Sequence, residues 1–167
     1  MPSYKFFLIT IMTISTSTSA WEEGFVYNDD VKIAYRDYGP IEGEPILLVQ
    51  GLGGQLINWP DHLIDFLINN GFRPIVFDNR DTGLSSRIES DQFNEGNRAK
   101  TINSTYIKYF LRLPIRPPYN LDDMANDSIA ILDHLSIDKS HLLGMSMGGM
   151  IAQIIAANHP ERIRTYT

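Results

Sequence analysis

Apolar residues near the start of the chain are spaced two apart, and this pattern predicts a pair of short strands. In FVYNDDVKIAYRDYG, Val31, Ile33 and Tyr35 alternate with Lys32, Ala34 and Arg36. A period of two is typical of a strand with one buried face. The polar residues 28–30 predict a turn between the two strands.

Continuous apolar runs predict strands of another kind. PILLVQ (residues 45–50) has the composition of a strand buried on both faces of a parallel sheet, and RPIVFD (73–78) is a second buried strand. SHLLGM (140–145) predicts a further strand, and one more begins near Arg162 in RIRTYT.

Helical spacing appears between these runs. Pro60 fits the first turn of a helix with Leu63, Ile64 and Leu67 on one side and Gly71 after its end. Residues 147–158 predict another helix.

Asn120 is the predicted N-cap of a third helix. Its inner stripe comprises Leu121, Met124, Ala125, Ser128, Ile129, Leu132 and Leu135, and its outer face comprises Asp122, Asp123, Asp127 and Asp133. Strands that alternate with helices after a hairpin predict an α/β fold with a mostly parallel sheet and flanking helices.

The stretch from about Arg87 to Pro118 is long for an α/β connection, and such loops are often functional. YIKYFLRLPIRPP (106–118) predicts a short helix and an extended segment that pack over the domain. Its arginines and aromatic residues leave two alternatives open, a flap over the active site and contact with a lipid surface.

Composition excludes several classes of site. The chain has 167 residues, 43% of them hydrophobic, with a formal net charge of −6 and no cysteine. Length and composition are those of one globular domain. The acidic balance argues against a nucleic-acid surface, and the lack of cysteine excludes disulfides, thiolate metal sites and cysteine nucleophiles.

The first twenty residues have the order of an export signal. Lys5 precedes the apolar run 6–14, and small residues follow, with Thr18 and Ala20 placed for cleavage before Trp21. Nine apolar residues are too few to form a stable membrane span. We therefore predict a signal at 1–20, a domain at 21–167, and an exported protein, periplasmic or secreted. An uncleaved N-terminus would leave the protein in the cytoplasm.

GMSMG, residues 144–148, places Ser146 between a predicted strand and a predicted helix. A sharp turn there exposes the serine hydroxyl, and Gly144 and Gly148 remove side chains that would clash. The helix N-terminus stabilises negative charge, so the Met147 N–H is placed for an oxyanion. A second N–H should come from Leu52 in QGLGG, where glycines 51 and 53 let the backbone approach a substrate.

PILLVQGLGGQLINWP, FDNRDTGLSS and YNLDDMANDSIAILDHLSIDKSHLLGMSMGGMIAQIIAANHPERI together resemble the α/β-hydrolase fold family, in particular its aclacinomycin methylesterase and enol-lactonase branch. The resemblance implies Ser146 as the nucleophile, the backbones of Leu52 and Met147 as the oxyanion hole, and no cofactor or metal. It also implies that Arg80 pairs with carboxylates. Gln50 departs from the family, in which many members have a histidine that supports the loop.

The family's acid and histidine follow the strand that begins near Arg162, and none of the four histidines fits the role of base. We therefore expect the N-terminal portion of the fold, about six of its eight strands, and an inactive 167-residue chain. Asp78 remains a minor catalytic candidate.

These observations predict a serine hydrolase acting on a small-molecule ester, lactone or thioester through an acyl-enzyme on Ser146. Two alternatives remain: a cofactor-free perhydrolase or C–C hydrolase, and a non-catalytic binding protein. Haloalkane dehalogenases and epoxide hydrolases of the family use aspartate where Ser146 stands.

Overall fold

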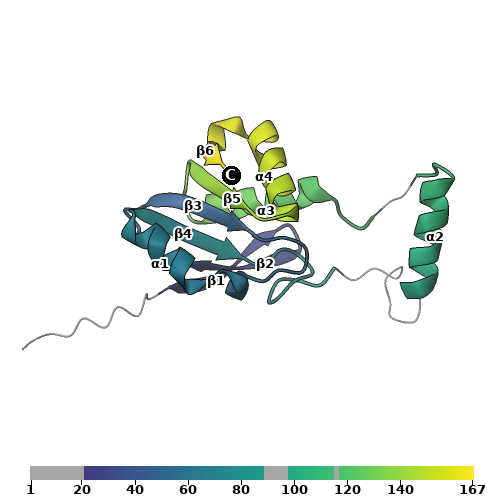
Figure 1. Ribbon diagram of the computed structural model, residues 1–167, viewed down its shortest axis with the longest axis horizontal. Helices are drawn as coiled ribbons and strands as arrows, with labels where there is room; N and C mark the ends of the chain where they lie inside the picture. Colours follow the sequence, from purple (N-terminus) through teal and green to yellow (C-terminus); the bar gives the residue numbers. More distant parts are fainter. Residues whose placement is uncertain (1–20, 89–97, 115–116) are drawn as a thin grey trace, which may run out of the picture.

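The computed structural model describes residues 21–88, 98–114 and 117–167. In this part of the chain, six strands form one sheet in the order β1-β2-β4-β3-β5-β6 (Figure 1). Their bounds are β1 Glu22–Asn28, β2 Val31–Asp37, β3 Glu44–Val49, β4 Phe72–Phe77, β5 Ser140–Gly144 and β6 Ile163–Tyr166. The helices are η1 Leu56–Asn58, α1 Asp61–Asn69, α2 Arg98–Phe110, α3 Leu121–His134, α4 Met147–Asn158 and η3 Pro160–Arg162. The predicted export signal lies outside the described residues.

The sheet is mixed. β1 and β2 form the predicted antiparallel hairpin, and β2 runs antiparallel to β4. β4, β3, β5 and β6 are parallel to one another. The predicted α/β class and the predicted strands are confirmed, and the carboxyl ends of the four parallel strands meet at one edge.

Strand β3 shows why an uninterrupted apolar run is needed at the centre. Ile46 and Leu48 pack with α1 in one hydrophobic cluster. Leu47 and Val49 pack with α3 and α4 in the other. Successive side chains of a strand point to opposite faces, so a strand covered on both faces needs apolar residues at every position.

Helix α3 confirms its predicted cap and corrects one predicted side chain. The Asn120 carboxamide accepts hydrogen bonds from the N–H groups of Asp122 and Asp123, as an N-cap does. Asp127, predicted on the outer face, is only 1% exposed. Its carboxylate accepts two hydrogen bonds of 2.7 Å from Arg80. The side chain is buried because the guanidinium supplies the opposite charge that a buried carboxylate requires.

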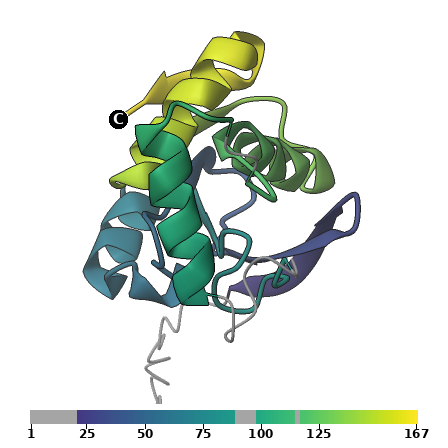
Figure 2. The same ribbon diagram turned by 90° about the vertical axis from the view of Figure 1, so that its right-hand side faces the viewer.

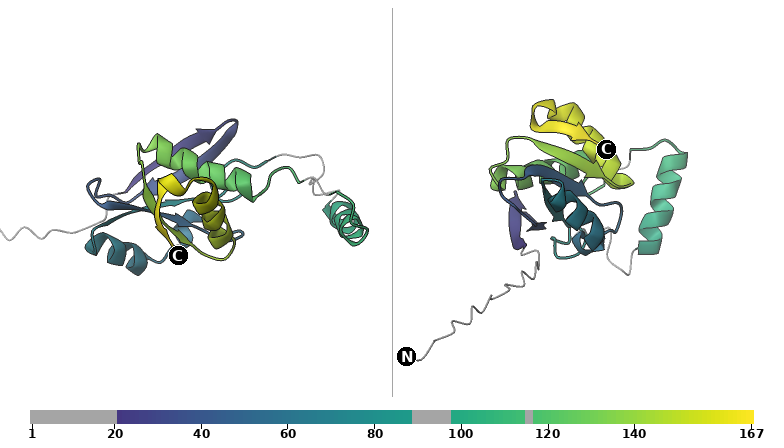
Figure 3. Two further views of the ribbon diagram at one scale, coloured as in Figure 1. Left: turned by 90° about the horizontal axis from the view of Figure 1, so that it is seen from above. Right: turned by 60° about the vertical axis from the view of Figure 1, so that its left-hand side comes forward.

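Helix α2 corrects the predicted packing of residues 106–118. It begins earlier than expected, at Arg98, and it stands apart from the sheet and the other helices (Figures 1 and 3). Its large apolar residues are exposed instead of packed, among them Tyr106, Tyr109 and Phe110. No helix in the described ranges is both long and apolar enough to cross a bilayer.

Candidate active site

Ser146 occupies a sharp turn between β5 and α4. Its φ of 55° and ψ of −117° lie in the left-handed half of backbone space, where a residue with a Cβ is strained by about 1–3 kcal/mol. The Met145 N–H donates to the Val49 carbonyl at 3.0 Å, and the Gly149 N–H donates to the Ser146 carbonyl at 2.9 Å. These bonds fix the turn to β3 on one side and to α4 on the other.

The Ser146 hydroxyl does not cap helix α4, which begins at the next residue. Ser146 is the N-cap of α4, and a serine at this position usually accepts a hydrogen bond from the first turn. Here the side chain makes no capping bond, and the residue is exposed. The hydroxyl is therefore open to an approaching ligand.

The glycines beside Ser146 are required by close backbone contacts. A Cβ on Gly148 would lie 2.0 Å from the Val49 carbonyl oxygen. A Cβ on Gly144 would lie 2.5 Å from the Gly148 carbonyl oxygen. Both distances are far below van der Waals contact, so α4 can approach β3 and β5 this closely only with glycine at positions 148 and 144, respectively.

The loop after β3 lies directly against Ser146. A Cβ on Gly51 would lie 3.2 Å from the Ser146 Cβ and 3.7 Å from its Oγ. Leu52, the next residue, is 87% exposed, and Gly53 has a φ of +72° with open space around it. The structure thus brings together the two segments that the sequence singled out, residues 51–53 and 144–148.

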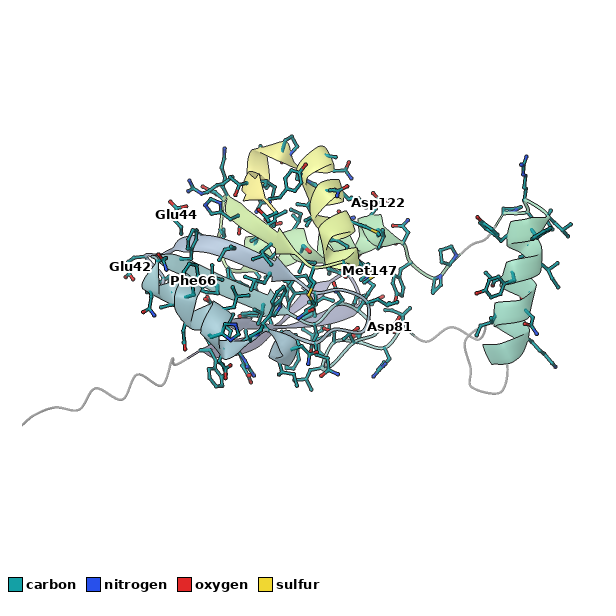
Figure 4. All side chains as sticks on the ribbon, viewed as in Figure 1. Glu42, Glu44, Phe66, Asp81, Asp122 and Met147 are labelled. Atoms are coloured by element: carbon teal, nitrogen blue, oxygen red, sulfur yellow. The ribbon has the colours of Figure 1, made fainter. Side chains whose placement is uncertain are left out.

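Both segments lie at the carboxyl edge of the parallel strands. In Figure 4, the labelled Met147 and Asp81 lie at the end of the body that is turned towards α2, and Glu44 lies at the other end. Figure 2, viewed from that side, places α2 in front of this edge. Ligands of open α/β sheets bind outside the carboxyl ends of the strands.

Asp78, the alternative catalytic candidate, joins two loops. One of its carboxylate oxygens accepts a hydrogen bond from the Leu56 N–H at 2.6 Å, and the other accepts one from the Leu84 N–H at 2.8 Å. The residue is 2% exposed, and a Cβ on Gly83 would overlap its carboxylate. With both oxygens occupied, Asp78 holds the loops after β3 and β4 together.

A polar cluster beside α3 completes this edge. The Arg80 guanidinium lies between the Asp127 carboxylate and the Tyr119 ring, whose centroid is 5.2 Å away. The pairing of Arg80 with a carboxylate matches the prediction. Burial, followed by the hydrogen bond to Asp81, raises the pKa of Tyr119 to about 12.

Sequence reasoning missed Tyr119 and the partner role of Asp127. The left-handed φ of 64° at Asp81 is visible only in the structure.

The four histidines lie away from Ser146, and none of them hydrogen-bonds to it. His141 contacts Glu44 at 3.3 Å, at the opposite end of the sheet. His159 follows the last turn of α4, about 18 Å along a twelve-residue helix. His134 packs on the ring of Tyr35, and His62 is exposed on α1. Within the described ranges, no cluster of histidine and carboxylate side chains could hold a metal.

Comparison with known proteins extends this picture. Residues 44–167 match the family described as alpha/beta hydrolase fold. Rhodomycin D methylesterase DnrP of Streptomyces peucetius is 31% identical over 85% of this chain and 40% of its own length. 3-Oxoadipate enol-lactonase 2 of Acinetobacter baylyi is 28% identical over 80% of this chain and 39% of its own.

Among solved structures, Est816, described as an N-acyl homoserine lactone degrading enzyme, superposes with a TM-score of 0.62. It is 27% identical, and the match covers 86% of this chain and 43% of Est816. The chain spans about 40% of the length of the curated relatives it matches.

Proposed function

The chain belongs to the alpha/beta hydrolase fold family, and on this premise we propose that it is the Ser146-bearing part of a serine hydrolase for carboxylic esters, lactones or thioesters. One observation supports this most strongly. The Ser146 hydroxyl is exposed at a strained turn, is not used as a helix cap, and lies beside the backbone of Gly51. Strained residues of this kind gather at functional sites.

The geometry supports a nucleophilic role for Ser146. The hydroxyl oxygen attacks the substrate carbonyl carbon, its proton passes to a base, and the carbonyl oxygen becomes an oxyanion. Collapse of the intermediate expels the alcohol or thiol, which takes up the proton. Water then attacks the acyl-enzyme and releases the carboxylic acid and the serine hydroxyl.

Two backbone N–H groups are placed to bind the oxyanion. Met147 is the first residue of α4, so its N–H has no acceptor within the helix. The second donor is the N–H of Leu52, which follows the glycine that packs against Ser146. Fixed donors of this kind stabilise the charge that develops in the transition state, and each is worth about 10²–10³ in rate.

None of the four histidines, all of which lie in the described ranges, is placed to act as the base. A base must lie within about 2.6–3.2 Å of the hydroxyl, and all four histidines are bound or exposed elsewhere. We therefore expect an acid and a histidine from further sequence to complete the site, and the 167-residue chain alone to lack turnover.

The substrate class rests on the relatives. Their names describe a methylesterase and an enol-lactonase, and the structural neighbour is described as degrading a lactone. All three descriptions involve a carboxylic ester bond, either open or cyclic. We extend this bond type, and not any particular acyl or alcohol group, to the present protein.

The test is ester and lactone turnover by the product of the complete gene and by its Ser146→Ala variant. The substitution should lower turnover by a factor on the order of 10³ or more without unfolding the protein. Comparable turnover in the folded variant would refute the proposal. Turnover by the unaltered 167-residue chain would refute the separate inference about the base.

A further inference from the structure

Charge is segregated in the segment that includes α2. Residues 98–121 hold five of the 14 basic residues of the chain and none of its 20 acidic residues. The five are Arg98, Lys100, Lys108, Arg112 and Arg116. The chain as a whole has a net charge of −6, so this basic segment stands out against an acidic protein.

Helix α2 is also amphipathic. Ile102, Tyr106, Tyr109 and Phe110 have the spacing i, i+4, i+7 and i+8, which places them on one face of the helix. Their exposed fractions are 45%, 71%, 73% and 90%. We call these four residues the apolar stripe. Lys108 lies on the side of the helix away from the stripe.

The helix stands at the carboxyl edge of the sheet, apart from the body (Figures 1 and 2). It ends at a left-handed turn, in which Arg112 has a φ of 54° and the Leu113 N–H donates to the Lys108 carbonyl at 2.8 Å. This arrangement closes the last turn of a helix without tertiary contacts. The apolar stripe is therefore both formed and accessible.

We propose that α2 is an interfacial helix that binds an anionic lipid surface through the apolar stripe. Aromatic and aliphatic side chains on one face of such a helix enter the boundary between headgroups and acyl chains. Lysine and arginine side chains extend to the anionic headgroups. The position of α2 would then turn the Ser146 edge of the sheet towards the lipid.

The charge pattern favours a lipid surface over two other surfaces on which the apolar stripe could pack. If the apolar stripe packed on the body of the same chain, the lysines of α2 would remain in water. They would then contribute nothing to that contact. Packing of two copies through the stripe would bring two basic helices together. Of these three surfaces, only an anionic lipid surface interacts favourably with both the apolar and the basic side chains.

The test is flotation of the complete gene product with vesicles of phosphatidylcholine, alone or mixed with phosphatidylglycerol, so that further sequence covering the stripe would prevent binding and overturn the inference. Binding to the anionic vesicles should be at least about tenfold stronger than to the neutral ones, and should weaken with salt. Tyr109→Ser with Phe110→Ser should reduce it about tenfold. The matched control, Ile107→Ser with Leu111→Ser, changes two exposed apolar residues off the stripe and should stay within about twofold.

A further variant tests the electrostatic part without removing apolar area. Lys100→Gln with Lys108→Gln should abolish most of the preference for anionic vesicles, while circular dichroism shows the helix content unchanged. All variants keep the same N-terminus, so its apolar run contributes equally to each. The inference is overturned if the parent chain does not bind, if both serine pairs lose binding equally, or if the aromatic pair has no effect. Vesicle binding needs no turnover, so its failure would leave the proposed hydrolase activity untouched.

Discussion

A methyl group at Gly148 should destabilise the protein far more than the same group at the adjacent Gly149. The Cβ of Gly148→Ala would lie 2.0 Å from the Val49 oxygen, and 2.7 and 2.8 Å from the Val49 carbon and the Gln50 oxygen. All three are backbone atoms at the end of the central strand. The Cβ of Gly149→Ala would meet nothing nearer than the Gly144 oxygen at 3.5 Å.

The magnitude follows from these distances. A carbon and an oxygen that are not bonded approach to about 3.3 Å, so α4 would have to move away from β3 by more than about 1 Å. Overpacking of a rigid core costs about 1–3 kcal/mol and occasionally more, and three backbone contacts place Gly148→Ala at about 3 kcal/mol. Alanine is favoured over glycine in a helix by up to about 1 kcal/mol at both positions. This helix preference is the same for both variants, so it cancels when they are compared. The difference between their free energies of unfolding should therefore remain about 3 kcal/mol.

Urea unfolding of the 167-residue chain and both variants, followed by circular dichroism and tryptophan fluorescence, gives the two free energies of unfolding. Gly149→Ala should match or exceed the parent chain, and Gly148→Ala should fall well below it or fail to fold. A Gly148→Ala variant within about 1 kcal/mol of Gly149→Ala would refute the account of the close turn.

Two further predictions concern the polar cluster. Asp127→Ala should lower the free energy of unfolding by about 3–5 kcal/mol, because it leaves the Arg80 guanidinium buried without its partner. The exposed ion pair of Asp133 is the control, and Asp133→Ala should cost at most about 1 kcal/mol. Burial raises the pKa of both Tyr35 and Tyr119, so phenolate absorbance should show late titration from both tyrosines. Tyr119→Phe should remove the step at the pKa of about 12. Because this pKa lies above the ordinary 10.0, the contribution of Tyr119 to stability is complete below pH 10.0 and is lost as the pH rises towards about 12. Equal losses of unfolding free energy in the two aspartate variants, or late phenolate titration that is unchanged in Tyr119→Phe, would contradict these predictions.

The local features of the fold could be predicted because their causes are local. Helix α4 has the predicted bounds, Met147–Asn158, since an apolar strand, a serine between glycines and a small-residue helix occur in one short stretch. Asn120 caps α3 as predicted, because capping depends on the side chain and the next three residues.

Features that depend on distant partners could not be predicted. Asp127 has the charge and helical position of a surface residue. Its burial is explained by partners distant in sequence, Arg80 47 positions earlier and Asn28 99 positions earlier. The helical spacing of α2 is visible in the sequence, but its position apart from the body is not, because an apolar stripe does not identify what it packs against. The closeness of Gly51 to Ser146 follows from the pairing of β3 with β5, a long-range contact.

The central claim is that Ser146 is the nucleophile, and the most direct measurement is covalent labelling of the complete gene product with a fluorophosphonate probe. Mass spectrometry of the digested protein should locate the phosphonyl group on the peptide that contains Ser146, and Ser146→Ala should abolish labelling. Labelling at another residue, or undiminished labelling of the folded Ser146→Ala variant, would contradict the account.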